Sequence, residues 1–315
     1  MTSRGAPRGS AQESGLPHRH HVRKAIIPLA GRGTRLLPAT KAVPKGMLPL
    51  IDKPVVQYVV EEAAATGLTD ILLITGRDHQ AFSAHFGPVL PVERLLAERG
   101  QREAAGDLAG LTRQVRIGLV TQDTPRGLGD AVLLGAGFAG TEPFAILLGD
   151  NVLCGAEDLL TTMIAARSKY GGTIVALTQA PRSEVASRGV VAFEPTADPA
   201  VVRITDVVEK PAPADAPSDW IMIGRCLCDP VIFPILRDTP AGLGGEIQLS
   251  DALRTLAALG QDSGGGVHGV FFSGRRLDTG NTHGYVQATV EMACARADIA
   301  GEFLPWLRQY VRTLG

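Results

Sequence analysis

The 315-residue sequence lacks a long hydrophobic run and lacks an excess of either charge. Its apolar blocks fall far short of the roughly 20 residues that a membrane-spanning helix needs. Lysine plus arginine number 31 and aspartate plus glutamate number 32, so the formal net charge of -1 provides no field to attract DNA or a membrane surface. These absences argue against a membrane protein and against nucleic acid as a main partner.

Cysteines are few, and their spacing suggests no pairing. The four of them form no CxxC motif, and the first 22 residues contain no apolar stretch of the kind that a secretory signal requires. Reduced thiols in the cytoplasm are therefore the simplest interpretation. The same 22 residues are rich in Gly, Ser, Pro, Arg and His, which predicts a disordered tail, and we interpret its histidines as solvated side chains rather than metal ligands.

Glycine and proline are abundant, with 37 and 21 residues, in a chain that is 45% hydrophobic. In the first half, apolar blocks typical of buried strands alternate with helical segments, which indicates helices on both faces of a parallel sheet. After about residue 180 the strands become shorter and more alternating. We predict an α/β fold with a Rossmann-like doubly wound mixed sheet and a smaller α+β portion. The predicted division is a core over 23–180, a second portion over 181–300 that completes the sheet, and a C-terminal helix over 301–315.

The individual elements follow from the same periodicities. Predicted strands cover 24–30, 71–74, 115–121, 144–148, 173–177, 190–193, 202–209, 221–228 and 267–272. Predicted helices begin at 54 and near 129, and cover 92–111, 159–166, 249–259, 285–297 and 303–314.

A glycine loop directly follows the first predicted strand. Gly31 and Gly33 allow backbone N–H groups to approach an anion closely. Arg35 and Lys45 follow on a segment that several prolines stiffen. The dinucleotide fingerprint GxGxxG is absent because Leu36 stands at its third glycine, and the P-loop motif is absent as well. A plain turn would explain two glycines, but the neighbouring cations favour a phosphate site.

Five ordered blocks carry a resemblance to a known family. They are GRGTRLLPATKAVPKGMLPLIDKP over 31–54, GLGDA over 127–131, VEKP over 208–211, GGEIQLSD over 244–251 and LDTG over 277–280. Together they resemble the sugar-1-phosphate nucleotidylyltransferases, and the ATK and PKxMLP portions look most like the bacterial UTP–glucose-1-phosphate uridylyltransferases. The resemblance covers about residues 24 to 300 and implies the nucleotide-diphospho-sugar transferase type of fold.

The resemblance also implies roles for individual residues. The catalytic cations would be Arg35, Lys45 and Lys210, and Mg²⁺ would be bound by Asp150 and Asp278. The nucleotide would be bound by Ala30, Gly31, Gly33, Thr34, Gln122, Gly127, Gly129 and Asp150. The sugar phosphate would be bound by Gly189, Glu209, Lys210 and Glu246. From the residues alone, an Asp after a strand is commonly a turn or cap residue, and Glu209 with Lys210 is equally consistent with a cross-strand ion pair.

The implied activity is Mg²⁺-dependent formation of UDP-glucose and pyrophosphate from UTP and glucose 1-phosphate. Two places depart from the family pattern: Gly46 replaces the usual glutamate of PKEMLP, and residues 187–189 lack the tyrosine often found before Gly189. Three alternatives therefore stay open: a thymidylyltransferase that uses dTTP, a non-catalytic nucleotide-sugar-binding paralogue, and a nicotinamide-dependent oxidoreductase, against which the missing third glycine counts.

We expect a homodimer or homotetramer. The C-terminal segment with Trp306, Leu307 and Val311 would either form the interface or cap the core of its own chain.

Overall fold

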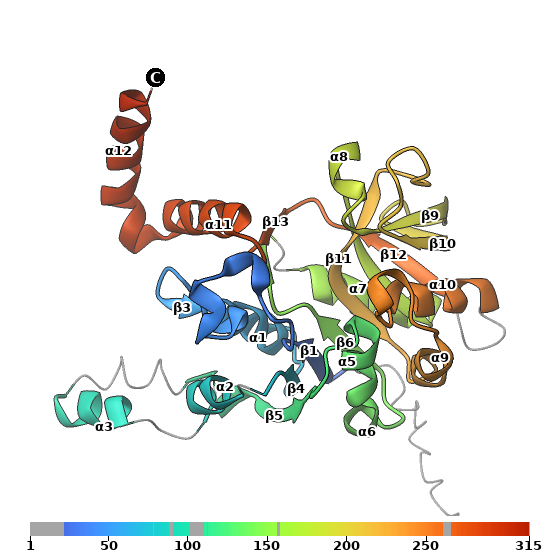
Figure 1. Ribbon diagram of the computed structural model, residues 1–315, viewed down its shortest axis with the longest axis horizontal. Coiled ribbons are helices and arrows are strands. Elements are labelled where there is room, and N and C mark those ends of the chain that lie inside the picture. The colour runs from blue at the N-terminus through green and yellow to red at the C-terminus, as the bar shows by residue number, and fades with distance from the viewer. Residues whose placement is uncertain are drawn as a thin grey trace, which may run out of the picture.

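The computed structural model describes residues 22–77, 79–87, 91–100, 110–111, 113–155, 158–260 and 266–314. Within these residues, one mixed sheet of nine strands forms the centre of the molecule (Figure 1). In spatial order its strands are β5 (Arg116–Thr121), β4 (Asp70–Thr75), β1 (Lys24–Pro28), β6 (Phe144–Leu147), β11 (Trp220–Cys228), β8 (Thr173–Gln179), β12 (Val267–Phe271), β10 (Val201–Glu209) and β9 (Gly189–Pro195). Two short ladders pair β13 (Arg275–Asp278) with β7 (Asn151–Cys154), and β2 (Pro49–Leu50) with β3 (Lys53–Pro54).

One half of the sheet is parallel and the other half is mixed. Strands β5, β4, β1 and β6 are parallel to one another, and β11 runs antiparallel between β6 and β8. Strand β8, which precedes residue 180, lies between β11 and β12, which follow it. The predicted second portion therefore does complete the same sheet, and the mixed doubly wound fold is confirmed. The domain boundary at 180 stays a prediction.

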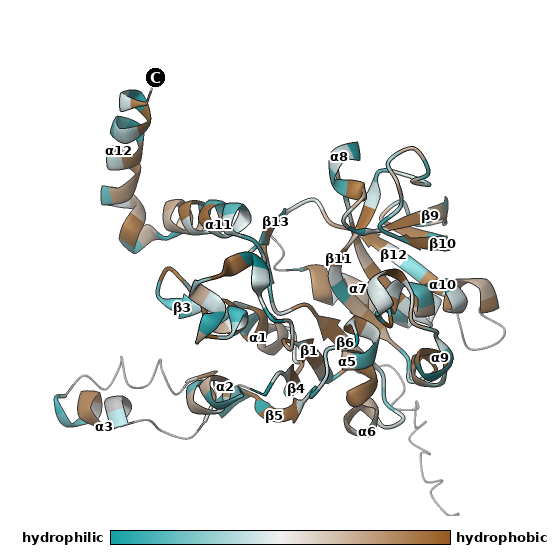
Figure 2. Cartoon of the chain, viewed as in Figure 1, coloured by the Kyte–Doolittle hydropathy of each residue, from teal (hydrophilic) through white to brown (hydrophobic). Residues whose placement is uncertain are grey.

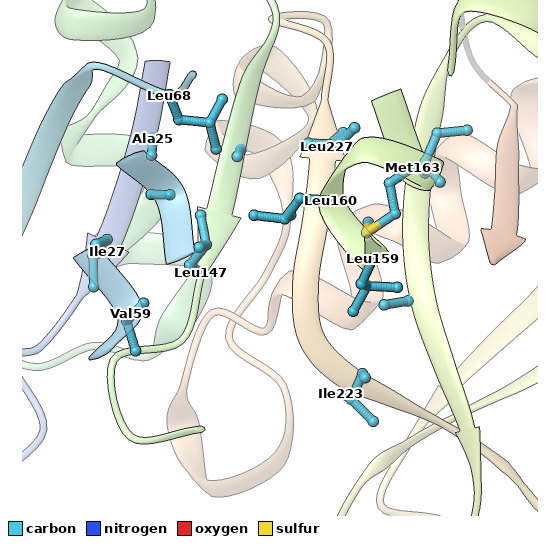
Figure 3. Close-up of a cluster of buried hydrophobic side chains, with 14 of the residues drawn as sticks. Ala25, Ile27, Val59, Leu68, Leu147, Leu159, Leu160, Met163, Ile223 and Leu227 are labelled. Atoms are coloured by element: carbon cyan, nitrogen blue, oxygen red, sulfur yellow. The ribbon is translucent and has the colours of Figure 1, made fainter. Parts of the chain in front are cut away.

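Two hydrophobic cores cover the two faces of the sheet, because successive strand residues point to opposite faces. On β1, Ala25 and Ile27 pack with α1 (Val55–Ala65) and α7 (Leu159–Tyr170), and Figure 3 shows Val59 and Leu160 among these side chains. Ile26 packs on the other face with α5 (Leu128–Leu134), α9 (Ile232–Asp238) and α10 (Leu249–Leu259). The continuous apolar strands predicted from the sequence are explained by this burial on both faces.

Helix α11 (Thr282–Ala295) contacts the long proline-rich loop after β1 and holds it in place. The loop contains the 3₁₀ turns η1 (Thr34–Leu36), η2 (Ala39–Lys41) and η3 (Lys45–Met47), followed by the β2–β3 hairpin. Thr282 Oγ1 donates to the carbonyl of Arg35 at 3.2 Å, and the hydroxyl of Tyr285 donates to the carbonyl of Pro49. A third, small apolar cluster that includes Leu50 and Ala288 lies between helix and loop. The loop is therefore fixed at both ends.

The remaining helices are α2 (Gln80–His85), α3 (Pro91–Glu98), α6 (Ala136–Ala139), α8 (Arg182–Val185), η4 (Leu243–Gly245) and α12 (Ala297–Thr313). Within the range 92–111 predicted as one helix, α3 ends at Glu98, and Gly100 after it has a positive φ of 77°. Residues 101–109 of the prediction lie outside the described residues, and residues 110–111 are helical. The predicted tail lies outside the described residues except for Val22, which is buried in the core.

Helix α12 leaves the body of the molecule and carries apolar bands along its length (Figures 1 and 2). It begins at Ala297 rather than 303 and contains Pro305, and none of its described residues is buried. Trp306 is 53% exposed and Val311 57%. Of the two expectations for this helix, the one in which it caps its own core is therefore wrong. Among the described residues, no helix combines the length and apolar character needed to cross a membrane.

Candidate active site

A cleft opens where β1, β5 and β6 end. One cavity of about 390 Å³ is lined by Ala30, Gly31, Lys45 and Gln122, among others. A second, of about 230 Å³, shares these four residues and adds Asp150. Because the lining residues are shared, we treat both as one space, the main cleft. It lies at the carboxyl ends of parallel strands, where open α/β sheets bind ligands.

The glycine loop closes onto a lysine. A Cβ added at Gly31 would lie 3.3 Å from Lys45 Nζ, and one added at Gly33 would lie 3.0 Å from Thr40 Cγ2. Gly33 also has a φ of 63°, which L side chains rarely adopt. Both glycines therefore allow the loop to pack closely around Lys45, which places a cation against the backbone of the loop.

Two carboxylates distant in sequence meet at this loop. Asp150 follows β6, and Asp278 ends β13. A Cβ built on Gly280 would lie 3.0 Å from Asp150 Oδ2, 3.1 Å from Asp278 Oδ1 and 3.6 Å from Arg35 Nη2. The two carboxylate oxygens are thus at most about 6 Å apart, with the guanidinium of Arg35 beside them. The backbone connects them too, because the N–H of Thr279 donates to the carbonyl of Asp150 at 3.0 Å.

Each of these carboxylates is paired with cations. Lys45 Nζ lies 2.5 Å from Asp150 Oδ2. Asp278 accepts hydrogen bonds from Arg188 and from the N–H of Gly280, the latter at 2.9 Å, and Arg276 lies 3.5 Å away. Burial raises the pKa of Asp278, but the hydrogen bond and charge of Arg188, the N–H of Gly280 and the charge of Arg276 together outweigh burial, so that the pKa lies below its ordinary value. Asp278 is therefore ionised at neutral pH.

The pair fits a Mg²⁺ site of the open kind. Mg²⁺ is commonly held by one or two carboxylates together with substrate phosphates and water. The side chains of Asp150 and Asp278 keep 20% and 15% of their surface accessible. Within the described part of the chain, no group of three or more His, Cys, Asp or Glu side chains could hold a metal ion, so phosphate and water would have to supply the other ligands.

Gln122 lines the main cleft together with Asp150. It is 5% exposed, and its amide nitrogen donates to Asp130 Oδ2 at 2.7 Å and to the carbonyl of Gly127 at 3.3 Å. Gly127 lines the cleft with a φ of 110°. Gly129 instead lies against Ile247, whose carbonyl accepts its N–H at 2.8 Å. The interaction with Asp130 fixes the orientation of the glutamine amide, which places one hydrogen-bonding edge at the cleft.

A smaller cavity of about 170 Å³, here called the second cavity, adjoins the main cleft through Leu128 and Leu148. Gly189 and Glu209 line it, and Ser250 Oγ donates to Glu209 Oε2 at 2.8 Å. A Cβ at Gly189 would lie 2.5 Å from Met222 Cε, so a side chain here would crowd the space.

Lys210 directly follows Glu209, which lines the second cavity. Its Nζ lies 3.3 Å from Glu209 Oε1, and its backbone has a φ of 47°, which is uncommon for a residue with a side chain. Strained backbone of this kind is concentrated at functional sites.

Comparison with known proteins decides the family. The model of the nucleotidyl transferase family matches residues 24–293. The chain belongs to this family. The resemblance stated from the sequence blocks is therefore confirmed over most of the chain.

Several relatives of this nucleotidyl transferase share the name UTP–glucose-1-phosphate uridylyltransferase. The chain is 37% identical to the UTP–glucose-1-phosphate uridylyltransferase YngB of Bacillus subtilis, over 93% of this chain and 97% of that protein. It is 38% identical to the UTP–glucose-1-phosphate uridylyltransferase of Streptococcus pneumoniae, over 93% and 96%. A crystal structure of UDP-glucose pyrophosphorylase complexed with UDP-glucose superposes with a TM-score of 0.79 at 35% identity, covering 88% of this chain and all of that one.

Most of the predicted site residues of the nucleotidyl transferase lie together. Ala30, Gly31, Lys45, Gln122, Gly127 and Asp150 line the main cleft, and Gly189 and Glu209 line the second cavity. Glu246, predicted on the sugar side, lines the main cleft instead. Gly33 packs against Thr40 behind the loop, Thr34 is exposed in η1, and Gly129 is buried under Ile247.

Sequence reasoning missed two arginines of this site. Arg188 and Arg276 both reach Asp278, and both line the second cavity. Arg276 also donates to Asn151 Oδ1 at 3.0 Å. Their only signal in the sequence is their position: Arg188 directly precedes Gly189, and Arg276 lies two residues before Asp278.

Proposed function

We propose that this nucleotidyl transferase forms UDP-glucose and pyrophosphate from UTP and glucose 1-phosphate. The names of its relatives support this substrate pair, as does the similarity to a structure holding UDP-glucose. The observation that carries the proposal is the meeting of Asp150 and Asp278 beside Arg35, at the place where the main cleft adjoins the second cavity. A triphosphate and a sugar phosphate could react there side by side.

The reaction needs no dedicated general base. A phosphate oxygen of glucose 1-phosphate is already anionic and attacks the α-phosphorus of UTP in line, and pyrophosphate leaves. Catalysis then depends on positioning and on neutralising charge. Arg35 and Lys45 would bind the triphosphate and the departing pyrophosphate, because both lie at the glycine loop. Lys210 would hold the phosphate of the sugar next to the second cavity.

Asp150 and Asp278 would bind Mg²⁺, which supplies charge neutralisation at the phosphates when bound. Lys45 and Arg188 occupy these carboxylates in the free protein. Binding of a divalent cation therefore requires both side chains to shift toward the phosphates. Their length and flexibility allow such a shift.

The pyrimidine would lie near Gln122 and Gly127. The amide group of Gln122 can accept from or donate to a base edge, and its orientation is fixed by Asp130. The glucose ring would lie in the second cavity, where Glu209 accepts hydrogen bonds and Gly189 leaves room. Glu246 would contact the nucleotide rather than the sugar. We further propose a cytoplasmic homodimer or homotetramer, which the exposed apolar residues of α12 support.

The test is to measure pyrophosphate release from each of UTP, dTTP, ATP and GTP combined with several sugar 1-phosphates. We expect the fastest release with UTP and glucose 1-phosphate. Faster release with dTTP would identify a thymidylyltransferase. Binding of UDP-glucose by calorimetry without any release would identify a non-catalytic paralogue, and binding of NAD would favour an oxidoreductase. No release with any pairing would contradict the proposal.

A further inference from the structure

Three guanidinium groups line the second cavity, and they differ in how fully they are engaged. Arg225 has a side chain with no exposed surface, and it donates to both oxygens of Glu62 at 2.8 and 2.6 Å. Arg276 is 11% exposed and donates to Asn151. Arg188 is 27% exposed, and it is the most accessible of the three.

The Nε atom of Arg188 is buried and finds no hydrogen-bond partner within the described residues. A buried donor left without an acceptor carries a free-energy cost. Within the described part of the chain, the guanidinium makes one hydrogen bond, from Nη2 to Asp278 Oδ2. Arg188 therefore retains the donors that a bidentate anion requires, on a side chain that has room to move.

The backbone places Arg188 directly beside Lys210. The N–H of Lys210 donates to the carbonyl of Arg188 at 2.9 Å, and Glu209 pairs with Gly189 in the β9–β10 ladder. The side chains of Arg188 and Lys210 therefore extend from backbone positions that are hydrogen-bonded to each other. A phosphate held by Lys210 would lie within the reach of a side chain as long as arginine.

We propose that Arg188 binds the phosphate of the sugar 1-phosphate and that it occupies Asp278 only in the free enzyme. This inference rests on the proposed function. When the sugar phosphate enters, the guanidinium exchanges the Asp278 carboxylate for the phosphate oxygens. Asp278 stays oriented by Arg276 and by the N–H of Gly280, and its released oxygen can bind a divalent cation.

The change in metal affinity on removing Arg188 distinguishes this exchange from a purely structural role. If Arg188 only tied β9 to β13, its removal would disorder Asp278 and weaken metal binding. If Arg188 competes with the metal, its removal strengthens metal binding. At the same time, loss of a charged hydrogen-bond donor weakens phosphate binding by about tenfold or more.

The experiment uses the full chain with Arg188→Gln. Calorimetry in EDTA measures the dissociation constants of glucose 1-phosphate and UTP, and paramagnetic resonance measures that of Mn²⁺ without substrate. We expect the glucose 1-phosphate constant to rise about 10- to 100-fold. The UTP constant should stay unchanged, and the Mn²⁺ constant should fall. Arg188→Lys, which keeps the charge but loses the planar fork, should lie between the two proteins.

The matched control is Arg203→Gln, an exposed arginine that pairs with Glu194 across the β9–β10 ladder. It should leave all three constants unchanged. Wild-type affinity for glucose 1-phosphate in Arg188→Gln, or weaker Mn²⁺ binding, would overturn the inference. A wild-type enzyme that ignores glucose 1-phosphate but binds another sugar 1-phosphate in an Arg188-dependent way would overturn the choice of sugar and support the inference.

Discussion

Lys45 joins the two halves of the candidate catalytic machinery. Its stem packs against Gly31 and Gly33, and its ammonium group contacts Asp150. A cation placed this way can move from the carboxylate to a triphosphate that enters over the glycine loop. Arg35 approaches the same carboxylates from η1, and it forms no ion pair with any described residue. In the free protein, Lys45 and Arg35 therefore lie where they could bind phosphate groups.

Lys210→Ala tests the assignment of the sugar phosphate. We expect the KM for glucose 1-phosphate to rise about tenfold or more, because a charged hydrogen bond to phosphate is lost, and the KM for UTP to stay within about twofold. Steady-state kinetics with each substrate varied in turn provides the measurement. Lys169→Ala, an exposed lysine on α7, is the control. An equal rise in both KM values would show that Lys210 does not serve the sugar phosphate.

Gly46 is a departure from the family pattern with a local physical explanation. A Cβ at this position would lie 2.9 Å from Leu29 Cδ2 and 3.5 Å from Phe82. Leu29, which is 3% exposed, therefore fills the space that a side chain at position 46 would need. The same Leu29 atom would lie 2.2 Å from a Cβ at Gly149. The side chain of Leu29 therefore leaves no room for a Cβ at either Gly46 or Gly149.

A double-mutant cycle on Leu29 and Gly46 tests this packing. Gly46→Ala should destabilise the protein by about 1–3 kcal/mol through overpacking, and Leu29→Ala by about 2–5 kcal/mol through a cavity. Together they should cost less than the two separately, since the new methyl group partly fills the cavity. Urea unfolding monitored by circular dichroism gives the free energies. Strictly additive values would contradict the packing account.

At the scale of elements, α11 is the part that holds the loop in place. It contacts the loop through Thr282 and Tyr285, and Arg296 at its end lies 2.5 Å from Asp52 in the hairpin turn. The glycine loop is therefore fixed by a helix from the other end of the chain.

The sequence predicts an element well when local residue periodicity defines it, and poorly when contacts between distant residues define it. Helix α10 was predicted at its observed bounds, because buried leucines recur at helical spacing and Gly260 ends it. The sequence does not predict the start of α12 at Ala297, since none of the helix's residues is buried and its first turns lack apolar periodicity. Arg188 was missed as a site residue because its partner, Asp278, is distant in the chain and near only in the fold.

The exposed face of α12 leads to a prediction about assembly. Trp306, Tyr310 and Val311 are each at least 48% exposed, and the rings of Trp306 and Tyr310 stack with their centroids 5.5 Å apart. Burying such residues against a second copy would stabilise an oligomer. We expect light scattering to give a dimer or tetramer for the wild-type protein and a smaller mass for Trp306→Ser combined with Val311→Ser. An unchanged mass in the double variant would exclude α12 from the interface.

At the scale of the whole molecule, one continuous sheet carries both the main cleft and the second cavity. The parallel strands β5, β4, β1 and β6 support the main cleft, and β9, β10 and β11 carry residues of the second cavity. Antiparallel β11 joins these two parts of the sheet. Asp150 follows β6 and Asp278 ends β13, so the two carboxylates lie on either side of the boundary predicted at residue 180. The reacting groups would therefore meet where the two portions of the chain are joined.

The most direct test of the central claim is phosphorus magnetic resonance of UTP and glucose 1-phosphate incubated with the protein and Mg²⁺. The account predicts that UDP-glucose and pyrophosphate appear in equal amounts, and that EDTA stops their formation. Unchanged UTP, or release of orthophosphate without UDP-glucose, would contradict it.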